Sequence, residues 1–167
     1  MRFTYCPDCG SKLILRPIGD EGLVPYCESC DKPLFDMFST CIIVMVVNEF
    51  EEVALLKQSY GNFPYRTLVA GYMKPGESAE ECTRREVLEE IGIELEQLQI
   101  VGTDWFARKE QLMIGFLGRA KKRDFTLSCE VEEAHWVPVE EALALMHPGK
   151  AISTELVRRY LEERSKV

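Results

Sequence analysis

The chain has 167 residues, and 46% of them are hydrophobic, which suits one medium-sized domain with a buried core and a small additional module. Its formal net charge of −8 at pH 7 disfavours an extended nucleic-acid interface, because such a surface needs an excess of lysine and arginine. No apolar run is long enough to span a bilayer and residues 1–7 lack a signal-peptide core, so we expect a cytoplasmic protein without a membrane partner.

Residues 1–36 are predicted to form a zinc ribbon, with a short strand at residues 12–17. Seventeen residues separate two cysteine pairs in this segment, Cys6-x2-Cys9 and Cys27-x2-Cys30. This spacing is typical of a structural zinc site made of two knuckles. A segment of about thirty residues cannot bury much apolar surface, so a bound metal would stabilise it. Two disulfides or four unused thiols are the alternatives, and a chain without a secretion signal favours neither.

The rest of the chain, residues 37–167, is predicted to contain several strands and three helices. Apolar runs indicate strands at residues 40–47, 53–58, 66–72, 95–106, 111–120 and 131–137. Helices are expected at residues 79–90, 138–146 and 152–163, and residues 60–65 form an aromatic loop. This order suggests an α/β domain with a mixed sheet between helices.

The first of these helices has clear start and stop signals. Ser78 lies three residues before Glu81, which is a capping-box pattern, and Gly92 is a natural helix end. Within the helix, three carboxylates are related by three- and four-residue steps and therefore share one face: Glu86, Glu89 and Glu90.

Three carboxylates on one face repel each other, and divalent cations would relieve that repulsion. Oxygen ligands at this density suit Mg²⁺ or Mn²⁺. Such ions bind diphosphate oxygens and activate water. Arg85 is expected outside the metal cluster, paired with Glu77 or Glu81. The alternative is an ordinary glutamate-rich surface helix, but the preceding loop, the two glycines and the arginine at fixed spacing favour a functional site.

The stretch from Gly71 to Ile93 matches the Nudix box, G-x5-E-x7-R-E-U-x-E-E-x-G-U with U aliphatic, without a gap. The chain therefore resembles the Nudix hydrolases. The resemblance implies an α/β/α sandwich, here preceded by the small zinc ribbon. It also implies that Glu86, Glu89 and Glu90 bind the catalytic metal and that Arg85 and Glu77 orient the loop on the helix.

A zinc ribbon directly before a Nudix domain resembles the NADH pyrophosphatase subfamily. The likeness continues through Leu68–Tyr72, the pair Leu112-Met113 and Glu130-x5-Trp136. Enzymes of that subfamily cleave the pyrophosphate of NADH to reduced nicotinamide mononucleotide and AMP, and some remove NAD caps from RNA. The subfamily's specificity motif, S-Q-P-W-P-F, is not conserved in residues 103–113, where only the tryptophan and the Leu-Met pair remain.

The same resemblance implies that Glu130 binds metal or acts as a base, with Glu133 as the next candidate. A carboxylate from outside the helix could approach the attacking water from another side. Three aromatic residues are candidates to stack on a base or nicotinamide ring, although each would also suit a core position: Tyr72, Trp105 and Phe106. A homodimer is compatible with the resemblance, but the sequence itself does not show one.

We therefore expect metal-dependent hydrolysis of the pyrophosphate linkage of a nucleoside diphosphate derivative, with an NADH- or NAD-like dinucleotide as the first candidate. The expected partner is a small nucleotide, with nucleic acid bound only through a capped RNA end. The expected cofactors are Mg²⁺ or Mn²⁺ for catalysis and Zn²⁺ for structure. The alternative is a Nudix-fold module that binds a nucleotide without turnover; such regulators often lose glutamates of the box, and here all are present.

Overall fold

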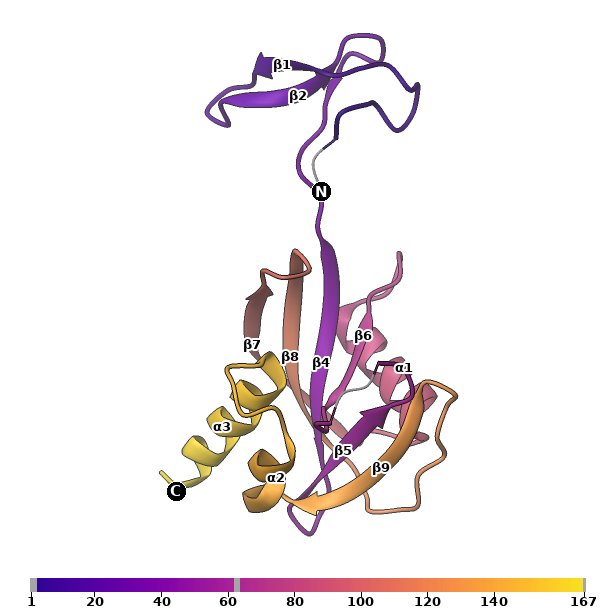
Figure 1. Ribbon diagram of the computed structural model, residues 1–167, viewed down its shortest axis with the longest axis vertical. Coiled ribbons are helices and arrows are strands. Elements are labelled where there is room, and N and C mark those ends of the chain that lie inside the picture. Colours follow the sequence, from indigo (N-terminus) through magenta and orange to yellow (C-terminus); the bar gives the residue numbers. More distant parts are fainter. Residues whose placement is uncertain (1–2, 62–63, 167) are drawn as a thin grey trace. The chain divides into compact units, whose positions relative to one another are not determined.

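The computed structural model describes residues 3–61 and 64–166. The chain divides into two compact units, one ending at Phe38 and the other beginning at Ser39. Each unit has its own sheet (Figure 1). Within the described residues, no helix is long and apolar enough to cross a membrane.

The N-terminal unit is a three-stranded antiparallel sheet in the order β1-β2-β3. Its strands are β1 (Ile14–Pro17), β2 (Leu23–Cys27) and β3 (Lys32–Pro33). Only the first had been predicted from the sequence. The buried apolar cluster of this unit is small and consists of Cys6, Cys27 and Leu34. So small a core leaves the cysteines as the main candidates for holding the unit together.

The second unit contains a six-stranded mixed sheet in the order β7-β8-β4-β5-β9, with β6 also paired to β4. Its strands are β4 (Ser39–Val47), β5 (Glu52–Gln58), β6 (Val69–Tyr72), β7 (Gln97–Phe106), β8 (Gln111–Arg119) and β9 (Val131–Pro138). The central strand β4 runs parallel to β8 over its whole length. On its other edge, β4 pairs with two strands in turn: with β6 at Cys41–Val44 and with β5 at Val47.

Helices cover both faces of this sheet (Figure 1). They are α1 (Ala79–Ile91), α2 (Val139–Leu145) and α3 (Ile152–Arg164). Odd-numbered residues of β4 from Cys41 to Val47 pack with α2 and α3, and even-numbered residues from Ile42 to Val46 pack with α1. This alternation follows from the two-residue period of a strand. The predicted α/β/α sandwich with a mixed sheet is therefore confirmed.

The helix α1 begins and ends where the sequence indicated. The side chain of Ser78 accepts a hydrogen bond from the backbone of Glu81, and the Glu81 side chain accepts one from the backbone of Ser78. Gly92 ends the helix in the left-handed region at φ 69°. The preceding strand, β6, is shorter than predicted because residues 66 and 67 form only isolated bridges. Residues 62 and 63 of the predicted aromatic loop lie outside the described residues.

Candidate active site and metal centre

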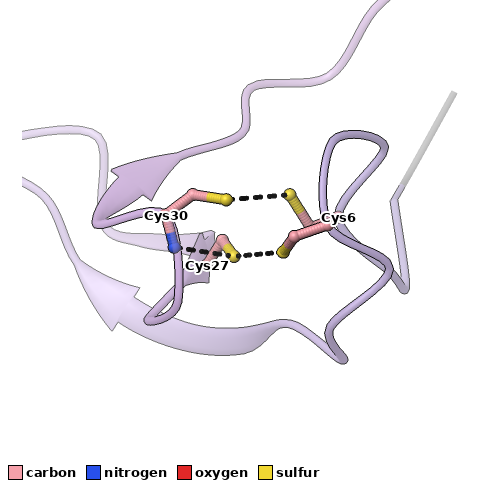
Figure 2. Close-up of side chains that lie close together, drawn as sticks. Cys6, Cys27 and Cys30 are labelled. Carbon is pink, nitrogen blue, oxygen red and sulfur yellow. Dashed lines mark hydrogen bonds between the residues drawn. The ribbon is translucent and has the colours of Figure 1, made fainter.

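The four cysteines of the predicted zinc site lie together in the N-terminal unit. All four Sγ atoms fall within 4.8 Å of one another. The Sγ atoms of Cys6 and Cys30 are 3.9 Å apart (Figure 2). Those of Cys9 and Cys27 are 3.5 Å apart. The backbone N–H of Cys30 donates to Cys27 Sγ at 3.4 Å, as is expected for a thiolate at a turn.

This geometry fits a tetrahedral metal ion and not a pair of disulfides. Four sulfurs at 2.3 Å from a central zinc ion would be about 3.8 Å apart, close to the separations observed. A disulfide would bring two sulfurs to about 2.05 Å, and all four cysteines are free. The donor set thus has the chemistry and the spacing to hold a metal ion.

In the second unit, Arg85 of α1 holds the loop that precedes the helix. Its Nε and Nη2 donate to the two carboxylate oxygens of Glu77, at 3.0 and 2.7 Å. The backbone N–H of Lys74 also donates to Glu77. These contacts, with Arg85 as the strongest, lower the pKa of Glu77 to about 2. A bidentate pair of this kind fixes direction as well as distance, so the loop is tied to α1 as the sequence predicted.

Arg85 also contacts two of the predicted metal ligands. Its Nη1 donates to Glu86 Oε1 at 2.6 Å and to Glu89 Oε2 at 3.0 Å. Glu86 is mostly enclosed, with 14% of its side chain exposed, whereas Glu89 is 53% exposed. The arginine therefore supplies positive charge to the carboxylate face of α1.

The position of Glu86 depends on the absence of a side chain at Gly71. A Cβ atom added at Gly71 would lie 2.1 Å from Glu86 Cδ and 2.3 Å from Glu86 Oε1. Gly71 belongs to β6, where it pairs with Ile42 and faces α1. Glycine at the start of the box is thus required by the close approach of a glutamate, which is a reason that the sequence alone does not reveal.

Glu90 is the most enclosed of the acidic residues in this region, with 7% of the residue exposed. The pKa of its carboxyl group is raised to about 8, first by burial and then by the negative charges of Glu86, Glu130 and Glu89, in that order. The structure therefore brings these four glutamates into one electrostatic neighbourhood. A buried carboxyl among like charges is the arrangement that a bound cation would relieve.

The chain that follows β8 brings Glu130 close to the end of α1. The N–H of Thr126 donates to the carbonyl of Ile91, and the N–H of Ser128 donates to the carbonyl of Glu90, each at 3.1 Å. Glu130 accepts through its carbonyl a hydrogen bond from Ser59 N–H at 2.9 Å, while its residue remains exposed. Backbone hydrogen bonds to the end of α1 and to Ser59 thus fix the position of Glu130.

Glu133, the alternative acid, has a different partner. Its carboxylate binds Arg66 Nη2 at 3.0 Å and lies 3.4 Å from His135 Nε2. The arginine contact is the largest cause of the lowered pKa of Glu133. Because its charge is already paired, Glu133 is less suited than Glu130 to assist at the carboxylate face.

The three aromatic candidates do not share one face of the sheet. Tyr72 is aligned with Cys41, and Phe106 packs against the core on the side of α2 and α3. Trp105 precedes Phe106 in β7 and therefore points to the opposite face. Tyr72 and Trp105 are 55% and 53% exposed, whereas Phe106 is partly buried.

Sequence reasoning missed two residues near this region. Gln111 is buried, with 4% exposure, and its Nε2 donates to the hydroxyl of Tyr72 at 2.6 Å. Tyr60 has a raised pKa, first through burial and then through the charges of Glu90 and Glu130. A polar residue at the start of an apolar strand was the one available signal for Gln111, and the aromatic loop was the signal for Tyr60.

Among the described residues, the four cysteines are the one group of three or more candidate ligand residues that lies close enough together to hold a metal ion, with all ligand atoms within 4.8 Å of one another. The carboxylates of α1 and Glu130 are neighbours without reaching that density, and Arg85 holds two of them. Their oxygen donors match the preference of hard divalent ions, and the charges that raise the pKa of Glu90 show where such an ion would be stabilised.

The fold and this region define a class of protein. The model of the NUDIX domain family matches residues 37–160. The chain therefore belongs to the NUDIX domain family.

Known proteins similar to the chain agree with this assignment. It is 32% identical over 161 residues to the NAD-capped RNA hydrolase NudC of Pseudomonas fluorescens, and that alignment covers 96% of this chain and 56% of the relative. A NudC of Pseudomonas putida has the same identity and coverage. The chain thus spans just over half the length of the curated relatives that it matches.

Solved structures show the same fold. The crystal structure of a NUDIX hydrolase from Nitrosomonas europaea has a TM-score of 0.75 at 22% identity, covering 98% of this chain and 93% of that one. A MutT protein from Methanosarcina mazei has a TM-score of 0.63 at 28% identity, covering 78% of this chain and 98% of that one. The NUDIX domain of Shewanella oneidensis NrtR, complexed with ADP ribose, also has a TM-score of 0.63, at 16% identity, covering 81% and 94%.

Proposed function

We propose that the chain is a metal-dependent pyrophosphohydrolase that cleaves the P–O–P linkage of a nucleoside diphosphate derivative. The observation that carries this proposal is the buried carboxyl of Glu90, whose pKa is raised first by burial and then by the charges of Glu86, Glu130 and Glu89. A structural role would not require a buried carboxyl beside three further glutamates, of which Arg85 binds only Glu86 and Glu89. A site that holds cations for a diphosphate substrate does require such a cluster of acidic groups.

The residues would divide the work as follows. Glu86, Glu89, Glu90 and Glu130 would hold Mg²⁺ or Mn²⁺. When bound, the ion supplies charge neutralisation for the diphosphate and activates water. Glu130 approaches from the chain leading into β9 and would orient or deprotonate the attacking water. Arg85 would keep the loop of Glu77 in place, and Tyr72, Trp105 and Phe106 are the candidates for contact with the rings of the substrate.

Hydrolysis by this arrangement balances simply. The oxygen of water forms a bond to one phosphorus, the bridging P–O bond breaks, and the bridging oxygen leaves with the other phosphate. An NADH-like dinucleotide would give two mononucleotides. The names of the curated relatives favour an NAD-related substrate, either free or at the end of an RNA.

The four cysteines of residues 1–36 would hold a structural zinc ion, because their sulfurs already have the spacing of a tetrahedral site. The unit beginning at Ser39 would then be the hydrolase domain. A homodimer, suggested by the resemblance to the subfamily, and a cytoplasmic location, expected from the sequence, remain predictions.

The test is turnover of a substrate panel by the full chain with Mg²⁺ or Mn²⁺. NADH, NAD, ADP-ribose and a dinucleoside polyphosphate would be compared, and hydrolysis in ¹⁸O-labelled water would identify the phosphorus that is attacked. We expect Glu90→Gln to lower kcat by orders of magnitude. Glu80→Gln, which alters an exposed glutamate in the first turn of the same helix, is the matched control and should retain activity.

Two results would contradict the proposal. Folded protein that hydrolyses no member of the panel would remove the enzymatic function, and tight nucleotide binding in that case would favour the sensing module instead. A wild-type rate in Glu90→Gln would remove this residue from the site. Comparing kcat/KM for NADH with that for a short NAD-capped RNA would then decide between free and RNA-linked substrates.

A further inference from the structure

We propose that Gln111 is a positioning residue that fixes the ring of Tyr72, so that Tyr72 can stack on an aromatic ring of the substrate. The ring would be a base or nicotinamide of the nucleoside diphosphate derivative. This inference rests on the proposed function and deepens it. It adds a residue from β8, outside the box, to the recognition of the substrate.

Gln111 has a buried side-chain amide that donates a hydrogen bond to Tyr72. It is 4% exposed at the first position of β8, and its Nε2 donates to the hydroxyl of Tyr72 at 2.6 Å. A buried amide that lost its partner would be destabilising, because its hydrogen-bonding capacity would no longer be satisfied. The phenol of Tyr72 therefore has one favoured place, next to this amide.

Tyr72 is also held at its backbone. Its carbonyl accepts hydrogen bonds from Arg85 Nη2 at 3.2 Å and from Cys82 Sγ at 3.6 Å. Yet 55% of Tyr72 is exposed. A tyrosine has only two side-chain torsions, so fixing the backbone and the hydroxyl leaves the ring little freedom. The result is an exposed aromatic ring with a defined plane.

The position of this ring suits a dinucleotide. Tyr72 directly follows Gly71, the glycine against which Glu86 lies. The Tyr72 side chain points to the opposite face of β6 from Gly71. Its carbonyl, however, binds Arg85, which also binds Glu86 and Glu89, so the residue that carries the ring is linked directly to the carboxylate face. Phe106 is aligned with Gln111 in the sheet but is partly buried against the core, so Tyr72 is the more accessible of the two rings on that face.

A purely structural role for the hydrogen bond is the alternative. In that case the bond would only satisfy the amide of Gln111, and the orientation of the ring would not matter to the substrate. The two explanations differ in what happens when both partners become apolar. Stability should recover under either, but recovery of substrate binding would occur only under the structural one.

The experiment uses the full chain with Tyr72→Phe, Gln111→Leu and the double variant. Tyr160→Phe is the matched control, because it removes a hydrogen-bonded hydroxyl that contacts Glu51 and Arg119. KM and kcat would be measured with NADH, and thermal stability would be measured in the same buffer. The dissociation constant of NADH would be obtained from its fluorescence in the Glu90→Gln background, where turnover is expected to be slow.

We expect each single variant to raise KM and the dissociation constant by roughly three- to tenfold, the usual effect of one hydrogen bond. kcat should stay within about twofold. The KM of the double variant should be no higher than that of the single variant with the higher KM. Its thermal stability should recover relative to Tyr72→Phe, while its KM stays above that of the wild type. Inhibition by inorganic pyrophosphate, which has no ring, should be the same in all four variants.

The inference would be overturned by an unchanged KM in Tyr72→Phe, by effects that multiply in the double variant, or by a KM that recovers together with stability. Turnover of NADH without any of the expected KM changes would reject this inference alone. Binding of NADH that depends on Tyr72 but leads to no turnover would reject the proposed function alone. Wild-type protein that neither binds nor hydrolyses NADH would reject both.

Discussion

The carboxyl group of Glu90 is enclosed at the last turn of α1, and its pKa is about 8 because of burial and the nearby charges of Glu86, Glu130 and Glu89. An ordinary glutamate titrates near pH 4.5. Between these values the metal-free folded protein holds a proton that the unfolded chain has released. Folding is therefore coupled to proton uptake at neutral pH.

The sign of the resulting pH dependence follows directly. The contribution of Glu90 to stability is fully present below about pH 4.5 and is lost as the pH rises towards 8. With about 1.4 kcal/mol for each pH unit, the loss is on the order of 5 kcal/mol. We expect Glu90→Gln, which cannot ionise, to be more stable than wild type at pH 9 in EDTA. The difference should shrink towards pH 5, as measured by denaturant unfolding at both pH values.

The same experiment with Glu80→Gln provides the comparison, because Glu80 is exposed in the first turn of α1. That variant should follow the wild-type pH dependence. A Glu90→Gln protein that is equally destabilised at both pH values would mean that the carboxyl is held by a specific hydrogen bond and not disfavoured by its surroundings.

Gly71 provides a second prediction at this scale. In Gly71→Ala the new Cβ would overlap Glu86 Cδ and Oε1, but these atoms belong to a flexible side chain that can turn away. We therefore expect the fold to survive with a small change in melting temperature, while affinity for Mn²⁺ and kcat fall by roughly tenfold or more, as is usual when a metal ligand is misplaced. Wild-type Mn²⁺ affinity in this variant would show that Glu86 is not a ligand.

Some residues could be assigned from the sequence and others could not, for physical reasons. Glu77, Arg85 and the three helix glutamates follow from local spacing, because a helix fixes which side chains are neighbours. The choice between Glu130 and Glu133 depends on the ion pair between Glu133 and Arg66, two residues that are 67 positions apart in the sequence. The pair of Gln111 and Tyr72 depends on the alignment of β6, β4 and β8, which the sequence does not specify.

At the scale of elements, local signals explain why α1 was predicted almost to the residue. A capping box starts it and a left-handed glycine ends it. The strands β2 and β3 were missed, because they are short and each contains a proline, a residue that strands normally disfavour. They form around the cysteine cluster, so their existence depends on contacts between the two knuckles.

The N-terminal sheet leads to a prediction about metal. Its buried apolar cluster consists of Cys6, Cys27 and Leu34, and Val24 and Tyr26 are the other buried apolar residues described in this unit, which is too little to fold it unaided. We expect one zinc ion per chain in elemental analysis of wild-type protein. In Cys27→Ser the zinc should be lost and residues 3–38 should become sensitive to limited proteolysis, because binding and folding of such units are coupled.

Cys129→Ser is the control for this prediction. Cys129 is exposed and does not belong to the four-cysteine group. It should keep both the zinc and the resistance to protease. An intact, protease-resistant N-terminal unit in zinc-free Cys27→Ser would contradict a structural role for the ion.

At the scale of the whole molecule, the core clusters of the second unit contain only residues from Cys41 onwards. Its sheet and helices also lie within Ser39–Val167. We therefore expect a fragment of residues 39–167 to fold alone and to unfold cooperatively on heating, as followed by circular dichroism. A fragment that is unfolded at 25 °C would show that the sheet depends on the N-terminal unit.

Arg85 gives the molecule a resident counter-ion that cannot diffuse away. Glu86 and Glu89 already share its Nη1 before any divalent ion arrives. Because Arg85 offsets part of the negative charge in a chain with a net charge of −8, removal of magnesium should leave α1 folded while hydrolysis stops. Binding of a divalent ion would then replace Arg85 as the positive partner of these carboxylates. We therefore expect a few hundred millimolar of a guanidinium salt to weaken binding of the divalent ion more than the same concentration of sodium chloride does.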